Sequence, residues 1–222
     1  MLQKNIGILI LSLFFWSFSF AQNKDSLLVF VGEKIEIKHI PQPISKKFID
    51  TIINEKDTIF EEKFVINTDS KFVAKYKVIQ ILNGRYVADT ISFNLFVHSG
   101  GPNFAPYKHA LLFVYPHKEE FYLEKYQSID VYLTKNKRWA GAYSVIDYQH
   151  PNNSRFTVKP EIIQFIEPVT YVIGSIADSP KNYPSPYYFI NSNQAKAVYG
   201  NYVEDLFKLK QQGVLKVRGY YK

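Results

Sequence analysis

Cysteine is absent from this chain of 222 residues. Its absence excludes a disulfide framework, a thiol nucleophile and a cysteine-based zinc site, and it leaves no cysteine to carry a lipid anchor. A chain of about 200 residues buries roughly 70% of its unfolded surface without such staples. Stability must therefore come from packing, for which the chain has 18 Phe and 17 Tyr.

The sequence signatures of common enzyme classes are also missing. We find no P-loop, no dinucleotide fingerprint, no Gly-x-Ser-x-Gly elbow and no histidine pair at the spacing of a zincin. No block of five or six like charges forms a nucleic-acid-binding arm. We therefore expect no catalytic, cofactor or metal site and no nucleic-acid partner. The formal net charge of +7 is a moderate surplus that suits an anionic partner.

The N-terminal residues have the pattern of an export signal. Lys4 precedes an apolar run, Ile6 to Phe20, and small residues stand at Ser19 and Ala21, the positions that a signal peptidase reads. We predict that residues 1–21 are a signal peptide and not an uncleaved anchor, because the run is shorter than the roughly 20 residues that span a bilayer. The mature chain is then expected to be exported, periplasmic or extracellular, with no membrane span and a charge of +6.

The stretch FVAKYKVIQILNGRYVADTISFNLF, residues 72–96, alternates apolar and polar side chains on both sides of Asn83-Gly84. This alternation predicts two half-buried strands, and Asn-Gly favours a tight hairpin between them. Lys75 and Lys77 are expected on the outer face, opposite Tyr76, so Tyr76 cannot stack a nucleic-acid base beside them. The inner face is predicted to hold Phe72, Ala74, Tyr76, Val78 and Leu82, then Ile91, Phe93, Leu95 and Val97.

Residues 27–40, LLVFVGEKIEIKHI, predict a first strand that bends. Gly32 stands where the pattern changes from apolar to charged, which favours a β-bulge. A bulge lets a strand coil around a small closed barrel and pair on both sides. Val29, Val31, Ile35 and Ile37 are predicted to share one face.

The remaining segments are less regular. Polar residues 41–70 predict an insertion with a short strand near 58–65, and further strands are expected at 110–115, 121–125 and 130–134. Residues 193–199 predict a helical turn. Asn201 can cap an amphipathic helix that ends at Gly213, and we expect this helix to pack on the end of a barrel, with a free partner-binding helix as the alternative.

Several of these motifs resemble netrin-like modules, the oligomer-binding (OB) type of barrel also seen in tissue inhibitors of metalloproteinases. They are VFVGEKI, FVAKYKVIQILNGRY, DTISFNLF and YKHALLFVYPHKEEFYLEKY, and the resemblance covers residues 27–132. It implies a small OB-like barrel of antiparallel strands and an extracytoplasmic binding role. Animal members carry disulfides, and the inhibitors chelate zinc through an N-terminal cysteine. Residue 22 here is Gln, so no inhibitory residue carries over.

The sequence thus predicts a mainly β fold with a C-terminal helix. A netrin-like barrel is expected in residues 22–158, with an insertion at about 41–70. Residues 159–222 are expected to form an extension whose helix packs on the barrel.

Candidate partner-binding residues gather in two loop-like segments rich in aromatic side chains. Exposed aromatics next to arginine are common interface anchors, although a Trp buried under its own loop fits the sequence equally well. The candidates are His98, Tyr107, His109, Arg138, Trp139 and Tyr143. We predict a non-enzymatic binding or structural module of the cell envelope, whose partner is a protein or an anionic polymer.

An exported hydrolase is the alternative function. His98 and His109 flank a Gly-Gly-Pro loop, and Ser99 lies beside the first of them. These three residues are the expected site if the loop brings them together.

Overall fold

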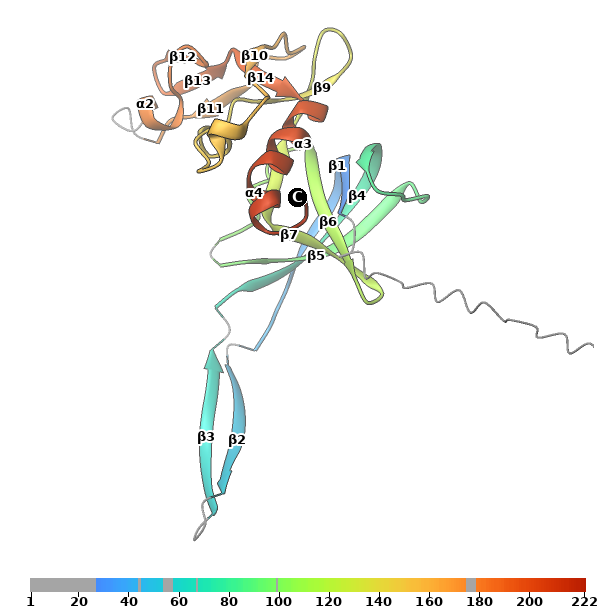
Figure 1. Cartoon of the computed structure of the whole chain (residues 1–222), viewed down its shortest axis with the longest axis vertical. Helices are drawn as coiled ribbons and strands as arrows, with labels where there is room; N and C mark the ends of the chain where they lie inside the picture. Colours follow the sequence, from blue (N-terminus) through green and yellow to red (C-terminus); the bar gives the residue numbers. More distant parts are fainter. Residues whose placement is uncertain (1–26, 44, 54–57, 67, 99, 175–178) are drawn as a thin grey trace, which may run out of the picture.

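The computed structural model describes residues 27–43, 45–53, 58–66, 68–98, 100–174 and 179–222. The predicted signal peptide lies outside these ranges. The described chain is mainly β with a C-terminal helix, as predicted. A central ring of strands carries a long two-stranded hairpin on one side and the C-terminal extension on the other (Figure 1).

Five strands pair in a closed ring. In spatial order they are β1 (Leu28–Ile40), β4 (Ser70–Asn83), β5 (Thr90–Val97), β7 (Glu120–Asp130) and β6 (His109–His117), which pairs back to β1. The expectation that all strands are antiparallel is wrong at one position, because β5 and β7 pair in parallel at Asn94 and Tyr122. Five strands cannot alternate in direction around a closed ring, so one parallel neighbour is unavoidable.

The bend of β1 lets it pair on both sides. Its first half pairs with β6, from Leu28 opposite Val114 to Glu33 opposite His109. Its pairing with β4 shifts register between Val31 and Gly32, where the sequence predicted a bulge.

A second register shift reverses the side-chain alternation of β1, because Ile35 is an extra residue between Lys34, opposite Tyr76, and Glu36, opposite Lys75. Val29 and Val31 face the C-terminal helix, whereas Ile37 packs inside the ring and Ile35 is exposed. The prediction that all four share one face is therefore wrong, because an extra residue at a bulge moves the following side chains to the other face.

Two hydrophobic clusters lie on opposite faces of β1 and β6, which explains why the start of β1, Leu28 to Val31, and the middle of β6 are continuously apolar. The inner core fills the ring, and its buried residues include Leu28, Phe30, Tyr76, Phe93, Leu112 and Val114. The outer core lies between the ring and the C-terminal helices and includes Val29, Val31, Leu111, Phe113, Leu206 and Leu215.

The predicted pairing of residues 72–96 is present, but its turn is not the predicted one. β4 and β5 pair from Ser70 opposite Val97 to Lys77 opposite Thr90, and β4 then continues alongside β1. The predicted tight turn at Asn83-Gly84 is wrong, because residues 84–89 all belong to the connection.

The inner and outer faces of this pair follow the predicted alternation closely. Tyr76 is buried in the inner core, while Lys75 and Lys77 are exposed. Leu82, at the far end of β4, packs against the outer core instead of the predicted inner face.

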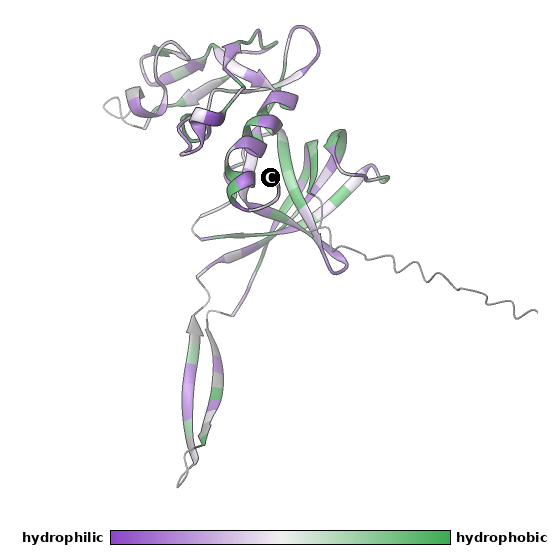
Figure 2. Cartoon of the chain, viewed as in Figure 1, coloured by the Kyte–Doolittle hydropathy of each residue, from purple (hydrophilic) through white to green (hydrophobic). Residues whose placement is uncertain are grey.

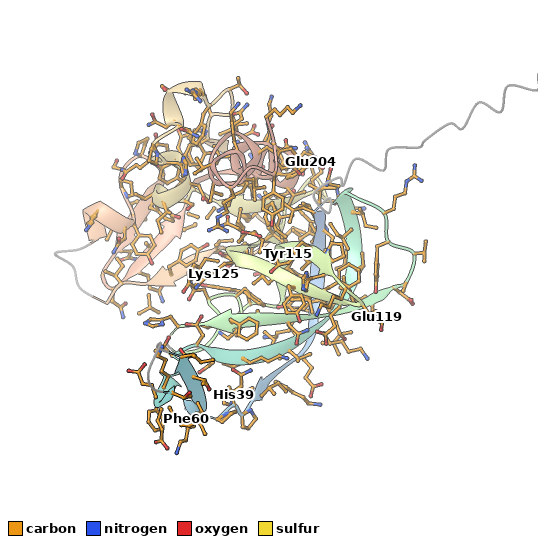
Figure 3. The ribbon with its side chains drawn as sticks, turned by 60° about the horizontal axis from the view of Figure 1, so that its bottom comes forward. His39, Phe60, Tyr115, Glu119, Lys125 and Glu204 are labelled. Carbon is orange, nitrogen blue, oxygen red and sulfur yellow. The ribbon has the colours of Figure 1, made fainter. Side chains whose placement is uncertain are left out.

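The insertion is a projecting hairpin, which we call the arm. It consists of β2 (Ser45–Ile53) and β3 (Thr58–Ile66), which pair with each other in a two-stranded sheet. The sequence predicted a strand near β3 and missed β2. Hydrophobic segments alternate with hydrophilic ones along the arm (Figure 2). Phe60, labelled in Figure 3, lies near the tip of the arm, where it pairs with Thr51 and is exposed.

The C-terminal extension adds two small sheets. One contains β10 (Glu161–Ile162), β14 (Tyr199–Tyr202), β9 (Trp139–Ala142) and β8 (Tyr132–Leu133), and the other contains β11 (Thr170–Val172), β13 (Gln194–Ala197) and β12 (Tyr188–Asn191). The helical turn predicted at 193–199 is wrong, since β13 occupies it. Short helical segments lie between the strands: α1 (Val145–Tyr148), the 3-10 turn η1 (Asn153–Arg155) and α2 (Ser179–Asn182).

Helix α3 (Val203–Gln212) lies against the ring and is followed by α4 (Val214–Val217). It ends at Gly213, as predicted, but the predicted cap at Asn201 is wrong. Asn201 lies in β14, where its side-chain amide donates to the carbonyl oxygen of Lys159 at 2.8 Å. In the part of the chain that the structure describes, no helix has the length and apolar character needed to span a bilayer.

Candidate functional site

A cleft of about 580 Å³ opens where the end of β7 and the end of β9 meet the three-stranded sheet β11-β13-β12 of the extension. We call it the tyrosine cleft. Its aromatic lining comes from Tyr143, Tyr171, Tyr183 and Tyr188. Its charged lining residues are Asp130, Asp147 and Lys181. Clefts of several hundred Å³ with apolar walls and a few polar groups are the usual form of ligand sites.

Strand pairing positions the rings of this cleft. Tyr171 in β11 lies opposite Ala195, and Tyr188 in β12 lies opposite Ala197. The small alanine side chains of the central strand β13 leave room for the two large rings on neighbouring strands. Asp130 ends β7 and so stands at the junction between the ring of strands and the extension.

The carboxylate of Asp130 joins residues that are distant in the sequence. Its Oδ2 atom accepts hydrogen bonds from the hydroxyl of Tyr132 at 2.8 Å and from that of Tyr171 at 2.7 Å. The hydroxyl of Tyr188 donates to the main-chain oxygen of Tyr143. These bonds hold the second sheet of the extension onto β7 and β9.

The tyrosine rings also pack on one another. Tyr143 stacks on Tyr187 with a centroid distance of 3.8 Å, and Tyr183 lies 5.8 Å from Tyr171 and 5.1 Å from Tyr188. Such aromatic pairs contribute about 0.5–1.5 kcal/mol each beyond the area they bury. The cleft wall is thus held by its own ring contacts.

Burial raises the pKa of Tyr171, of Tyr183 and of Tyr188, and the negative charge of Asp130 raises each pKa further. Because the ordinary pKa of tyrosine already lies well above 7, these phenols are neutral near pH 7. They act as hydrogen-bond donors and not as bases.

A buried ion pair lies beside the cleft. The ammonium group of Lys210, in α3, lies 2.5 Å from Oδ1 of Asp147, and both side chains are largely buried. Ser144 caps the short helix α1, where its hydroxyl accepts from the main-chain N–H of Asp147 at 3.4 Å. Asp147 is thus positioned by its own helix and neutralised by α3.

One of the predicted partner-binding residues, Tyr143, lines this cleft. The ring of Tyr107 lies 6.4 Å from that of Tyr132, which donates to Asp130. Burial raises the pKa of Tyr107, and the charge of Asp130 contributes to the shift.

The other predicted residues lie elsewhere. His109 and Trp139 contact each other, with ring centroids 4.5 Å apart, and Trp139 packs against the outer core. Burial lowers the pKa of His109. The guanidinium of Arg138 lies over the ring of Tyr202, 3.7 Å from its centroid, and pairs with a carboxylate of α3.

The two described residues of the alternative hydrolase contact different partners. Nδ1 of His98 lies 3.1 Å from Oδ1 of Asp69, whereas His109 contacts Trp139. Ser99 lies outside the described residues. No three His, Asp or Glu side chains of the described ranges come together as metal ligands.

Sequence reasoning missed most of the cleft. Tyr171, Tyr183 and Tyr188 fall in the C-terminal extension, where the density of tyrosine in residues 171–188 was the available signal. Asp130 carried no signal, because one acidic residue at the end of a strand is usually solvated.

We compared the chain with protein-family models, with curated proteins and with solved structures, and none of them matched.

Proposed function

We propose that this chain is an exported, non-enzymatic binding module built on an OB-type barrel, with its ligand site in the tyrosine cleft. The observation that carries the proposal is the cleft itself, in which four tyrosines and Asp130 converge from β7, from the end of β9 and from the extension. Export is supported by the sequence pattern of residues 1–21.

The strand order supports an OB-type barrel. When the five ring strands are numbered along the chain, their spatial order is 1-2-3-5-4, with the third and fifth parallel. An OB fold is a five-stranded Greek-key barrel that binds through its second and third strands and through the connections between strands 1 and 2 and between strands 4 and 5. The arm occupies the first of these connections. A netrin-like module without cysteine remains our proposal for this ring.

The cleft chemistry supports binding over catalysis. A nucleophile needs a base within hydrogen-bonding distance. Among the described lining residues, the hydroxyl of Ser144 instead accepts from a main-chain N–H, and Asp147 is committed to Lys210. The tyrosines are neutral donors. These groups can orient a ligand and exclude water from it.

A titration with variants of the cleft tests this proposal. Asn182 lines the cleft and is exposed, so Asn182→Trp should fill the cleft without disturbing the core. Val87→Trp, at a fully exposed position in the connection after β4, is the matched control. The probes are N-acetyl-arginine amide, choline, maltotriose and benzamide. Isothermal titration calorimetry measures the affinity of each probe for the wild-type chain and for the two variants.

We expect at least one probe to bind the wild-type chain. Its affinity should fall about tenfold or more in Asn182→Trp, because a hot-spot contact is typically worth that much. Val87→Trp should bind as the wild type does. If no probe binds, or if the two Trp variants weaken binding equally, the cleft is not the site and the proposal fails.

A further inference from the structure

Three carboxylates near the junction of ring and extension are buried or half-buried, and two of them form ion pairs with basic side chains. Glu124 pairs with Arg218, and Asp147 pairs with Lys210. Asp130 accepts from two tyrosine hydroxyls. No Lys, Arg or His in the described ranges forms an ion pair with it.

This difference has an energetic consequence. A carboxylate withdrawn from water loses solvation unless a positive charge or several hydrogen bonds replace it. Glu124 receives both, since the hydroxyl of Tyr220 also donates to it at 2.5 Å. Asp130 receives two neutral hydroxyl donors, both on the same oxygen, so its charge is only partly compensated within the described structure.

Building on the proposed function, we infer that the tyrosine cleft binds a monovalent organic cation, an ammonium or guanidinium group, which pairs with Asp130 among the tyrosine side chains. Cations are also attracted to aromatic rings, by about 0.5–2 kcal/mol. A small amine or guanidine and a Lys or Arg side chain of a partner protein share this chemistry.

The charge of Asp130 acts across the whole cleft. Burial raises the pKa of Tyr132, Tyr107, Tyr183 and Tyr188, and the charge of Asp130 raises each of them further. Tyrosines of the extension and tyrosines next to β7 therefore both experience its negative potential. Lys181 is the opposing charge, and it is exposed, so solvent and salt screen it strongly.

A divalent metal ion fits the cleft less well than an organic cation. Calcium and magnesium take six or more oxygen ligands. Asp147, the second carboxylate of the lining, is held by Lys210. The hydroxyls beside Asp130 point their hydrogens toward its carboxylate, so they present donors on that side.

A pair of ligands matched in shape and a pair of variants matched in charge change test the inference. N-acetyl-arginine amide and N-acetyl-citrulline amide have nearly the same shape and differ in charge. Asp130→Asn keeps a carbonyl oxygen that can accept from both tyrosines and removes the negative charge. Asp89→Asn, at an exposed position away from the cleft, is the control.

We expect the arginine probe to bind the wild-type chain about tenfold or more tightly than the citrulline probe, as for other hydrogen bonds to charged groups. This preference should vanish in Asp130→Asn and persist in Asp89→Asn. A short Gly-Ser peptide with one central Arg identifies the source: tighter binding than the amide indicates a protein partner, and equal binding indicates a small molecule.

The inference and the proposed function fail in different ways. If citrulline or maltotriose binds in the cleft as tightly as arginine, the cleft is a ligand site and the inference of a cation is wrong. If none of these probes binds the wild-type chain more tightly than it binds Asn182→Trp, the proposed function is wrong as well. Should Asp130→Asn not fold, the wild type still decides, because arginine affinity must fall with added sodium chloride and citrulline affinity must not.

Discussion

At the scale of single residues, the tightest backbone approach lies where β14 pairs with β9. A Cβ atom on Gly200 would lie 2.0 Å from the main-chain oxygen of Gly141, closer than any real contact. The neighbouring atoms belong to the backbone and cannot rotate away. Glycine at position 200 is therefore what lets the extension join the sheet of β8 and β9.

We expect Gly200→Ala to lower the free energy of unfolding by about 1–3 kcal/mol or more, because the strands must move apart to admit the methyl group. Gly174→Ala is the control, since an added Cβ there meets no atom within 4 Å. It should change stability by less than about 0.5 kcal/mol. Urea unfolding followed by circular dichroism measures both, and equal stability of the two variants would contradict this account.

Single residues also show what could be predicted from sequence. Gly32 was identified as a bulge because a glycine interrupted a strand pattern, and Tyr76 was placed inward by its alternation with Lys75 and Lys77. Both signals are local. The bond from Tyr171 to Asp130 joins residues 41 positions apart in the chain, and no local pattern encodes it.

At the scale of elements, the arm is the feature least supported by the rest of the molecule. Its strands pair with each other, and its described side chains include the exposed apolar residues Ile49, Ile53, Phe60 and Phe64. A two-stranded hairpin is only marginally stable alone in water. Ion pairs such as Lys47 with Glu62 cross the ribbon but are exposed and contribute little.

Replacing residues 45–66 with a short Gly-Ser turn should therefore change the free energy of unfolding by less than about 1 kcal/mol, since a lone hairpin contributes little to the ring. Thermal unfolding of the shortened chain and the full chain measures the difference. A shortened chain that fails to fold or melts far below the full chain would show that the arm supports the ring.

Elements were predicted well where both local signals and periodicity agreed. The end of α3 at Gly213 follows from glycine, and the strands β4, β5 and β6 follow from alternation or apolar runs. The prediction failed at β13, because residues 193–199 were expected to form a helical turn. The sheet context there overrides the helix propensity of alanine, because neighbouring tyrosines occupy the space above small residues.

At the scale of the whole molecule, ring and extension are interlocked. One sheet joins β8 and β9 to β10 and β14, on both sides of the boundary expected near residue 158. Helix α3 packs on the ring through the outer core and reaches α1 through Lys210. The tyrosine cleft lies at this junction, so its shape depends on both parts.

The most direct test of the ligand site is the NMR spectrum of the chain with labelled tyrosine rings during titration with N-acetyl-arginine amide. We predict that the ring signals of Tyr143, Tyr171, Tyr183 and Tyr188 shift together, while those of Tyr86 and Tyr126, outside the cleft, stay in place. Shifts confined to Tyr86 or Tyr126, or no shift at saturating probe, would contradict the assignment of the tyrosine cleft as the binding site.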